Sequence, residues 1–109
     1  MNDETNGPMN VREIRIPNLL GLHARPSAEF VKLSSGFDAE VFVAKDDLEV
    51  NGKSIMGVMM LAAECGSTLK IRTEGPQAEE ALAALAELVA GGFGEELADD
   101  AGAGPGAGS

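Results

Sequence analysis

The chain has 109 residues, of which 44% are hydrophobic and 24% charged, so it has the length of one compact domain and excludes a second large one. Asp and Glu number 18 against 8 Lys and Arg, which gives a formal net charge of −10 and argues against nucleic acid as a partner. One cysteine and one histidine cannot form an internal disulfide or a cluster of metal ligands, so we expect no metal and no cofactor.

The sequence shows neither a membrane segment nor a secretory signal. No stretch approaches the roughly 20 apolar residues that a membrane-spanning helix requires. The first ten residues are polar and acidic, unlike the basic and then apolar start of a secretory signal. We therefore expect a cytoplasmic protein with no membrane insertion.

Both ends of the chain are rich in Gly, Asn, Asp and Pro and contain little that could be buried. Such segments cannot offset the conformational entropy that they would lose on ordering. The sequence therefore predicts a flexible extension at residues 1–9, one domain at residues 10–94, and a disordered acidic tail rich in Gly and Ala at residues 95–109.

The first two predicted elements are a strand and a helix. Alternation of apolar and charged residues, with Ile14 and Ile16 on one face, predicts a half-buried strand at residues 11–16. Apolar residues then recur at helical spacing, which predicts a helix at residues 24–35 that ends at Gly36. Each of these elements has one apolar face to bury.

A hairpin and a second helix are predicted next. Alternating residues at 39–43 and the short run at 48–50 are separated by two aspartates at 46–47, which are typical of a turn. Ser54 can cap a helix that extends to Ala63. Because this helix is dense in Met and Leu and has few polar positions, we expect it to be mostly buried or to contact a partner.

The last two predicted elements are an alternating strand at residues 68–73 and an amphipathic helix over residues 78–89. The order is then βαββαβα, with strands that are apolar on one face and helices that can cover it. This pattern predicts an α+β two-layer sandwich. The short hairpin must be antiparallel, and ferredoxin-like and related split-βαβ arrangements both remain open.

The stretch at residues 18–26 places the only histidine, His23, at the last loop position before the first predicted helix. A helix N-terminus offers unpaired backbone N–H groups and a partial positive charge, which together favour an anion such as phosphate. Arg25, in the first turn of the same helix, adds a planar guanidinium suited to phosphate oxygens. The sequence therefore predicts a phosphate site at His23.

His23 can also react with a phosphoryl group. A neutral imidazole keeps a lone pair on one ring nitrogen at cytoplasmic pH, so it can form a covalent phosphohistidine. No second base, metal ligand or Ser/Asp partner is near His23 in the sequence, which favours a carrier that needs another protein's active site over an enzyme. The same pattern also fits a histidine that only caps a helix, with Arg25 as ordinary surface charge.

Two motifs carry a resemblance to a known family, GLHARP at residues 21–26 and NGKSIMGVM at residues 51–59. Over about residues 10–95 the chain resembles HPr, the phosphocarrier family of the bacterial phosphoenolpyruvate-dependent phosphotransferase system. The resemblance implies that phospho-Enzyme I phosphorylates His23 on Nδ1, that Arg25 helps to hold the phosphoryl group, and that enzyme IIA domains receive it. It also implies an open-faced sandwich in which three helices cover one face of a four-stranded antiparallel sheet.

The resemblance assigns further residues. Ser54 matches the serine that a bifunctional HPr kinase/phosphorylase modifies in many bacteria, although it can equally be a simple helix N-cap. The family's docking surface surrounds the histidine, and Leu22, Met56 and Met59 are candidates for it because flexible methionines suit a patch that accepts several partners. The two methionines could instead belong to the core. We expect a monomer.

Features of two branches of the family occur together. Residues 60–61 (ML) and 92–95 (GFGE) resemble the nitrogen-related paralogue, which usually works in regulation, whereas residues 53–56 (KSIM) resemble the sugar-branch or kinase-regulated form. Two functions therefore stay open. One is a phosphohistidine carrier in sugar uptake or regulation, and the other is a protein whose phosphorylation on His23 or Ser54 sets its binding to other proteins without onward sugar transport.

Overall fold

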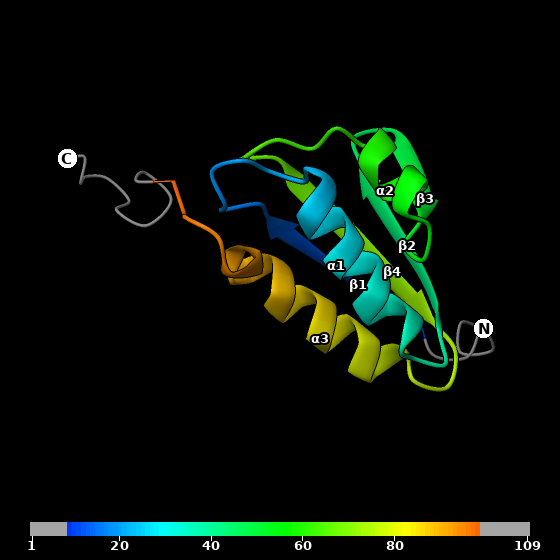
Figure 1. Ribbon diagram of the computed structural model, residues 1–109. Helices are drawn as coiled ribbons and strands as arrows, with labels where there is room; N and C mark the ends of the chain where they lie inside the picture. Colours follow the sequence, from blue (N-terminus) through cyan, green and yellow to red (C-terminus); the bar gives the residue numbers. More distant parts are fainter. Residues whose placement is uncertain (1–8, 99–109) are drawn as a thin grey trace.

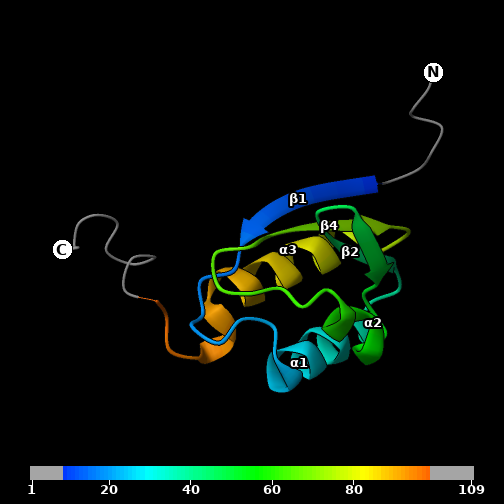
Figure 2. The same cartoon turned by 90° about the horizontal axis from the view of Figure 1, so that it is seen from above.

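Three helices cover one face of a four-stranded antiparallel sheet in the computed structural model, which describes residues 9–98 (Figures 1 and 2). The order along the chain confirms the predicted βαββαβα sandwich. Its elements are β1 (Met9–Arg15), α1 (Ala24–Ser35), β2 (Glu40–Lys45), β3 (Leu48–Asn51), α2 (Ile55–Met60), β4 (Thr68–Glu74), α3 (Ala78–Ala90) and a short 3₁₀ turn, η2 (Gly92–Gly94).

The last strand in the sequence lies in the middle of the sheet. The strand order is β1-β4-β2-β3, and every neighbouring pair is antiparallel. Leu69 of β4 is opposite Ile14 of β1, and Ile71 of β4 is opposite Val43 of β2, so their apolar side chains share one face. The alternation seen in the sequence therefore marks the face that the helices cover.

The core lies between the sheet and the helices. Phe30 of α1 is fully buried, and full burial of one such side chain contributes about 1.5–3 kcal/mol. No helix within residues 9–98 is long and apolar enough to cross a membrane. The fully buried apolar side chains of the core cluster come from both layers: Ile16, Phe30, Val43, Val58, Leu69, Ile71, Leu85 and Val89.

Helix α2 is shorter and more exposed than the sequence predicts. The expected helix extended to Ala63, but the α-helix ends at Met60, and Ala62 has a left-handed backbone (φ +48°) that a right-handed helix cannot continue through. Only Val58 of α2 is buried, whereas Met56 is 75% exposed. The helix is therefore not mostly buried, and contact with a partner is the alternative that remains.

The N-terminal boundary differs slightly from the prediction. Met9, which the sequence places in the flexible extension, is the first residue of β1 and is opposite Glu74. Residues 1–8 and 99–109, to which the flexible extension and the disordered tail were otherwise assigned, lie outside the described part of the chain.

The C-terminal boundary needs a larger correction. Residues 95–98, which we call the C-terminal strap, were predicted to begin a disordered tail, yet they run beside the loop that follows β1. The Leu19 N–H donates to the Glu96 carbonyl oxygen at 2.9 Å, and the Ala98 N–H donates to the Pro17 carbonyl oxygen at 3.0 Å. These pairings satisfy backbone groups of both segments, so the folded domain extends to residue 98.

The loop between β1 and α1 depends on Gly21. This residue has φ +67°, and a Cβ added to it would lie 2.6 Å from the Ala63 carbonyl oxygen. That same oxygen accepts a hydrogen bond from the Leu22 N–H at 2.9 Å, so it cannot easily move away. Both the backbone conformation and the space therefore require glycine here.

We expect Gly21→Ala to lower the free energy of unfolding by about 2–3 kcal/mol, because a positive φ and a backbone clash act together. Gly94→Ala is the matched control, since Gly94 has φ +73° but nothing within 4 Å of an added Cβ. It should lose only about 1–2 kcal/mol, the cost of the backbone conformation alone. Urea unfolding of the two variants measures the difference, and equal losses would contradict the clash.

Candidate functional site

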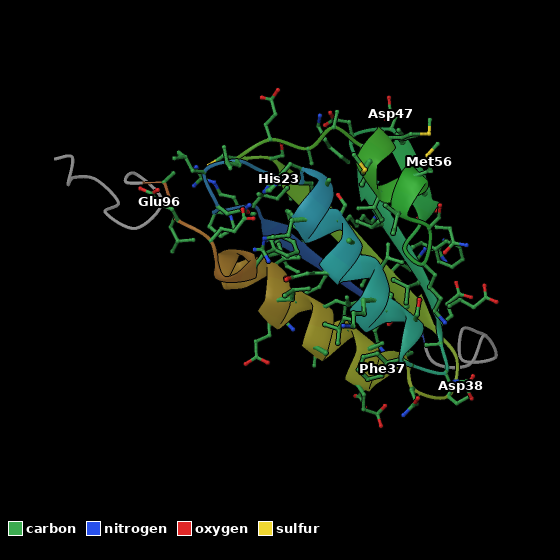
Figure 3. The ribbon with its side chains drawn as sticks, viewed as in Figure 1. His23, Phe37, Asp38, Asp47, Met56 and Glu96 are labelled. Atoms are coloured by element: carbon green, nitrogen blue, oxygen red, sulfur yellow. The ribbon has the colours of Figure 1, made fainter. Side chains whose placement is uncertain are left out.

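His23 is the N-cap residue of α1, as the sequence predicts, with extended backbone angles (φ −79°, ψ −169°). Its side chain makes no capping hydrogen bond, so the imidazole is available for other contacts. The side chain is 38% exposed. Figure 3 shows it at the start of α1, between the strap on one side, marked by Glu96, and α2 on the other, marked by Met56.

One carboxylate of the strap connects the site. Oxygen Oε2 of Glu95 lies 2.8 Å from Nε2 of His23 and 2.9 Å from Nε of Arg25, which donates to it. Its other oxygen, Oε1, accepts a hydrogen bond at 3.0 Å from Nδ2 of the fully buried Asn18. The strap, the β1–α1 loop and the first turn of α1 therefore meet at this carboxylate.

Glu95 is held in its charged form. Burial of the carboxyl group by itself raises its pKa, but the hydrogen bonds from Asn18, His23 and Arg25 outweigh this, so the pKa lies below the ordinary glutamate value. A carboxylate at Nε2 favours the imidazole tautomer in which Nε2 carries the proton. Nδ1, which has no partner within residues 9–98, then keeps the free lone pair.

Arg25 is held by three acceptors. Besides Glu95, its Nη1 donates to Oε2 of Glu29 at 2.5 Å, one helical turn further along α1, and its Nη2 donates to the Phe93 carbonyl oxygen at 2.6 Å. The Arg25 side chain is nevertheless 47% exposed. It therefore lies next to His23 with its charge already shared between two carboxylates.

The start of α1 adds free backbone donors. The Ser27 N–H bonds to the His23 carbonyl oxygen at 3.0 Å, and Pro26 has no N–H. The N–H groups of Ala24 and Arg25 have no acceptor within the described residues, as expected for the first turn of a helix. They are suited to an anion attached to His23. Residues 9–98 hold no group of three or more metal-ligating side chains.

The structure separates the three predicted docking residues. Met56 and Met59 are 75% and 42% exposed on α2, so neither belongs to the core. Leu22 is only 5% exposed and packs in the core cluster, so its assignment to a docking surface is wrong. Its position immediately before His23 suggested exposure, but the loop turns its side chain inward while its N–H bonds to Ala63.

Ser54 caps α2 as predicted. Its Oγ accepts a hydrogen bond from the Gly57 N–H at 3.0 Å, and its side chain is half-buried. It lies at the start of α2, the helix that carries the exposed methionines, and within residues 9–98 no hydrogen bond joins it to His23.

Two residues of the site were missed by sequence reasoning. Glu95 was assigned to the disordered tail, and Asn18 was given no role. Glu95 is 72 positions away from His23 in the sequence, so local spacing contains no sign of the contact. The available signal was the GFGE segment at residues 92–95, which resembles the nitrogen-related paralogue and therefore belongs to the folded region.

Known proteins resemble this chain over most of its length. A family model described as "PTS HPr component phosphorylation site" matches residues 11–91, which include His23. "Phosphocarrier protein HPr" of Neisseria meningitidis serogroup A is 51% identical over 84 residues, which cover 77% of this chain and 94% of that protein. "Phosphocarrier protein NPr" of Escherichia coli is 40% identical over 90 residues, 81% of this chain and 100% of that protein.

A solved structure agrees with the fold. The crystal structure of HPr-C-His from Thermoanaerobacter tengcongensis matches with a TM-score of 0.77 and 46% sequence identity. The match covers 81% of this chain and 99% of that chain.

We expect Glu95→Gln to lower the free energy of unfolding at pH 7 by about 1–2 kcal/mol, because charge-assisted hydrogen bonds become neutral ones. Since the folded pKa of Glu95 is lowered, its stabilising effect is complete above the ordinary glutamate pKa and is lost as pH falls through the folded pKa. Urea unfolding between pH 7 and pH 3 should show the two proteins converging. Glu96→Gln, at an exposed neighbour, should match wild type throughout.

Proposed function

The chain belongs to the HPr family and is a phosphocarrier of the phosphotransferase system, and on this premise we propose that His23 carries the phosphoryl group. Phospho-Enzyme I is the donor, Nδ1 of His23 is the acceptor atom, and enzyme IIA domains receive the group. The observation that best supports this assignment is the contact between Nε2 and Glu95, because it leaves Nδ1 as the ring nitrogen with the free lone pair.

The proposed transfer is an in-line displacement at phosphorus. The Nδ1 lone pair forms the new phosphorus–nitrogen bond while the bond from phosphorus to the donor breaks, and that electron pair leaves with the donor. The ring keeps its Nε2 proton and becomes positively charged. Glu95, at 2.8 Å, offsets this charge, and transfer to the next protein reverses the steps.

The start of α1 stabilises the phosphoryl group in this proposal. The free N–H groups of Ala24 and Arg25 and the partial positive charge of the helix end are suited to its oxygens. Three of the five N–H donors of Arg25 are committed, to Glu95, Glu29 and the Phe93 carbonyl oxygen, which leaves two that can bond to phosphoryl oxygens. The start of α1 and Arg25 therefore contribute to the transfer by positioning the phosphoryl group and by stabilising its negative charge.

Partner proteins complete each transfer in the proposal. The site offers a nucleophile and anion donors, and catalytic groups for donor and acceptor come from Enzyme I and enzyme IIA. Met56 and Met59 are the exposed candidates for docking them. We propose that the protein acts as a cytoplasmic monomer.

We propose Ser54 as a second phosphorylation site, for an HPr kinase/phosphorylase. Its Oγ is already committed to the α2 cap, so a kinase must free this oxygen from the Gly57 N–H or reach its remaining lone pair. A phosphate there would add a dianion beside the exposed methionines of α2 and oppose docking of acidic partners. A purely regulatory role without sugar transport has in its favour only the relative named NPr.

We expect wild type to gain one acid-labile phosphoryl group when it is incubated with phosphoenolpyruvate and Enzyme I, and His23→Ala to gain none, because the acceptor atom is absent. Intact mass and phosphorus NMR measure the product. Ser54→Ala is the matched control and should be labelled like wild type, although it loses the helix cap and about 1 kcal/mol of stability.

Labelling of His23→Ala would contradict the assignment of the acceptor. Failure of wild type to be labelled by an Enzyme I that labels another HPr would contradict the carrier mechanism for this chain.

A further inference from the structure

Most of the large exposed apolar side chains of the described residues lie in two patches, one on each side of His23. One is on α2 and the adjoining hairpin and includes the predicted docking residues. The other consists of Leu19 and Leu20, which are 51% and 70% exposed, and we call it the leucine patch. In Figure 3 the strap, labelled at Glu96, and α2, labelled at Met56, lie on opposite sides of His23.

The leucine patch is presented by a braced turn. The Gly21 N–H donates to the Asn18 carbonyl oxygen at 3.1 Å, and Asn18 Nδ2 donates back to the Gly21 carbonyl oxygen at 2.9 Å, so Leu19 and Leu20 occupy the centre of a four-residue turn. The turn is also joined to the strap by an antiparallel bridge between Asn18 and Leu97. These contacts fix the backbone of the turn, so the exposure of the leucines does not result from a loose loop.

Folding stability does not account for this arrangement. Full burial of a leucine contributes about 1.5–3 kcal/mol, most of which Leu20 forgoes. A group of exposed apolar side chains on a rigid support is typical of an interaction surface. A hollow of about 350 Å³ is lined by the two turn leucines and by Glu95 and Glu96 of the strap, so an apolar side chain of another molecule can enter there.

The leucine patch is continuous with the site. Glu95 lines the hollow and bonds to His23 with the same carboxylate. A protein that brings its reacting group to Nδ1 of His23 therefore covers the neighbourhood of the hollow as well. The rim is acidic, because Glu95 and the exposed Glu96 line the hollow and no Lys or Arg does.

We propose that the leucine patch is a second docking surface for the protein that phosphorylates His23, Enzyme I, separate from the methionines of α2. This rests on the proposed function. The partner surface should present an apolar side chain flanked by Lys or Arg, which fits an apolar hollow with an acidic rim. Contact with both the leucine patch and the methionines of α2 then holds Enzyme I on the two sides of His23 and fixes the orientation of Nδ1 relative to the donor phosphoryl group.

The test is a binding titration of the isotope-labelled full chain with unphosphorylated Enzyme I, followed by NMR. Leu20→Ser should raise Kd about three- to tenfold, because it removes apolar contact area. Glu96→Lys should also raise Kd, and more so at low salt than at high salt. Val11→Ser is the matched control, since Val11 is 44% exposed on β1 and lies outside both patches, and it should bind like wild type.

Phosphorylation by Enzyme I provides a second readout. Leu20→Ser should raise KM with little change in kcat, since the reacting groups are intact. A Kd for Leu20→Ser equal to that of Val11→Ser overturns the proposal, and so does a Leu20→Ser effect confined to transfer to enzyme IIA. Weaker binding of Leu20→Ser supports the patch even if His23 is not the acceptor, so the two proposals can fail separately.

Discussion

The arrangement of the site depends on one carboxylate, that of Glu95. It accepts hydrogen bonds from a buried amide of the β1–α1 loop and from a guanidinium on α1, and it contacts the imidazole between them. A carboxylate with little exposure is stable only when such donors offset the loss of water, so strap, loop and helix start stabilise one another. The same contact orients the ring of His23 and selects its tautomer. The contacts of Glu95 therefore both stabilise this part of the fold and prepare His23 for reaction.

The fold brings residue 95 to residue 23 through the direction of its helices. α1 begins where α3 ends, as Figure 1 shows, because both lie across the same face of the sheet in opposite directions. The turn η2 then leads the chain to the β1–α1 loop, with Phe93 buried at φ +57°. Two backbone hydrogen bonds between strap and loop complete the contact. A site between segments this distant in sequence is possible only once the sandwich has formed.

The sequence predicted what local periodicity can report. The helix at residues 24–35 was found with the bounds that the structure has, and β2 and β4 were found because their buried residues alternate with more exposed ones. The strand β3 has no buried residue and was found from the turn that precedes it. Periodicity does not show which residues far apart in the sequence contact each other. Glu95 was therefore assigned to the tail, because the composition of residues 95–109 is typical of a disordered segment. The wrong predictions of a docking role for Leu22 and of a longer α2 have related causes. Adjacency to a reactive residue does not determine which way a side chain turns, and apolar composition does not show whether a helix faces the core or a partner.

The contacts of Arg25 fit the requirements of a carrier in the proposed mechanism. A carrier must release its phosphoryl group as readily as it accepts it, so binding the phosphorylated state too strongly would slow the second transfer. Arg25 already shares its positive charge with Glu29 and Glu95, which reduces the net gain when it also donates to phosphoryl oxygens. Glu95 in turn stabilises the positively charged ring that makes the phosphohistidine a good donor. The carboxylates thus act in opposite directions on the phosphorylated state: their contacts with Arg25 limit its stabilisation, and Glu95 adds to it by offsetting the charge of the ring.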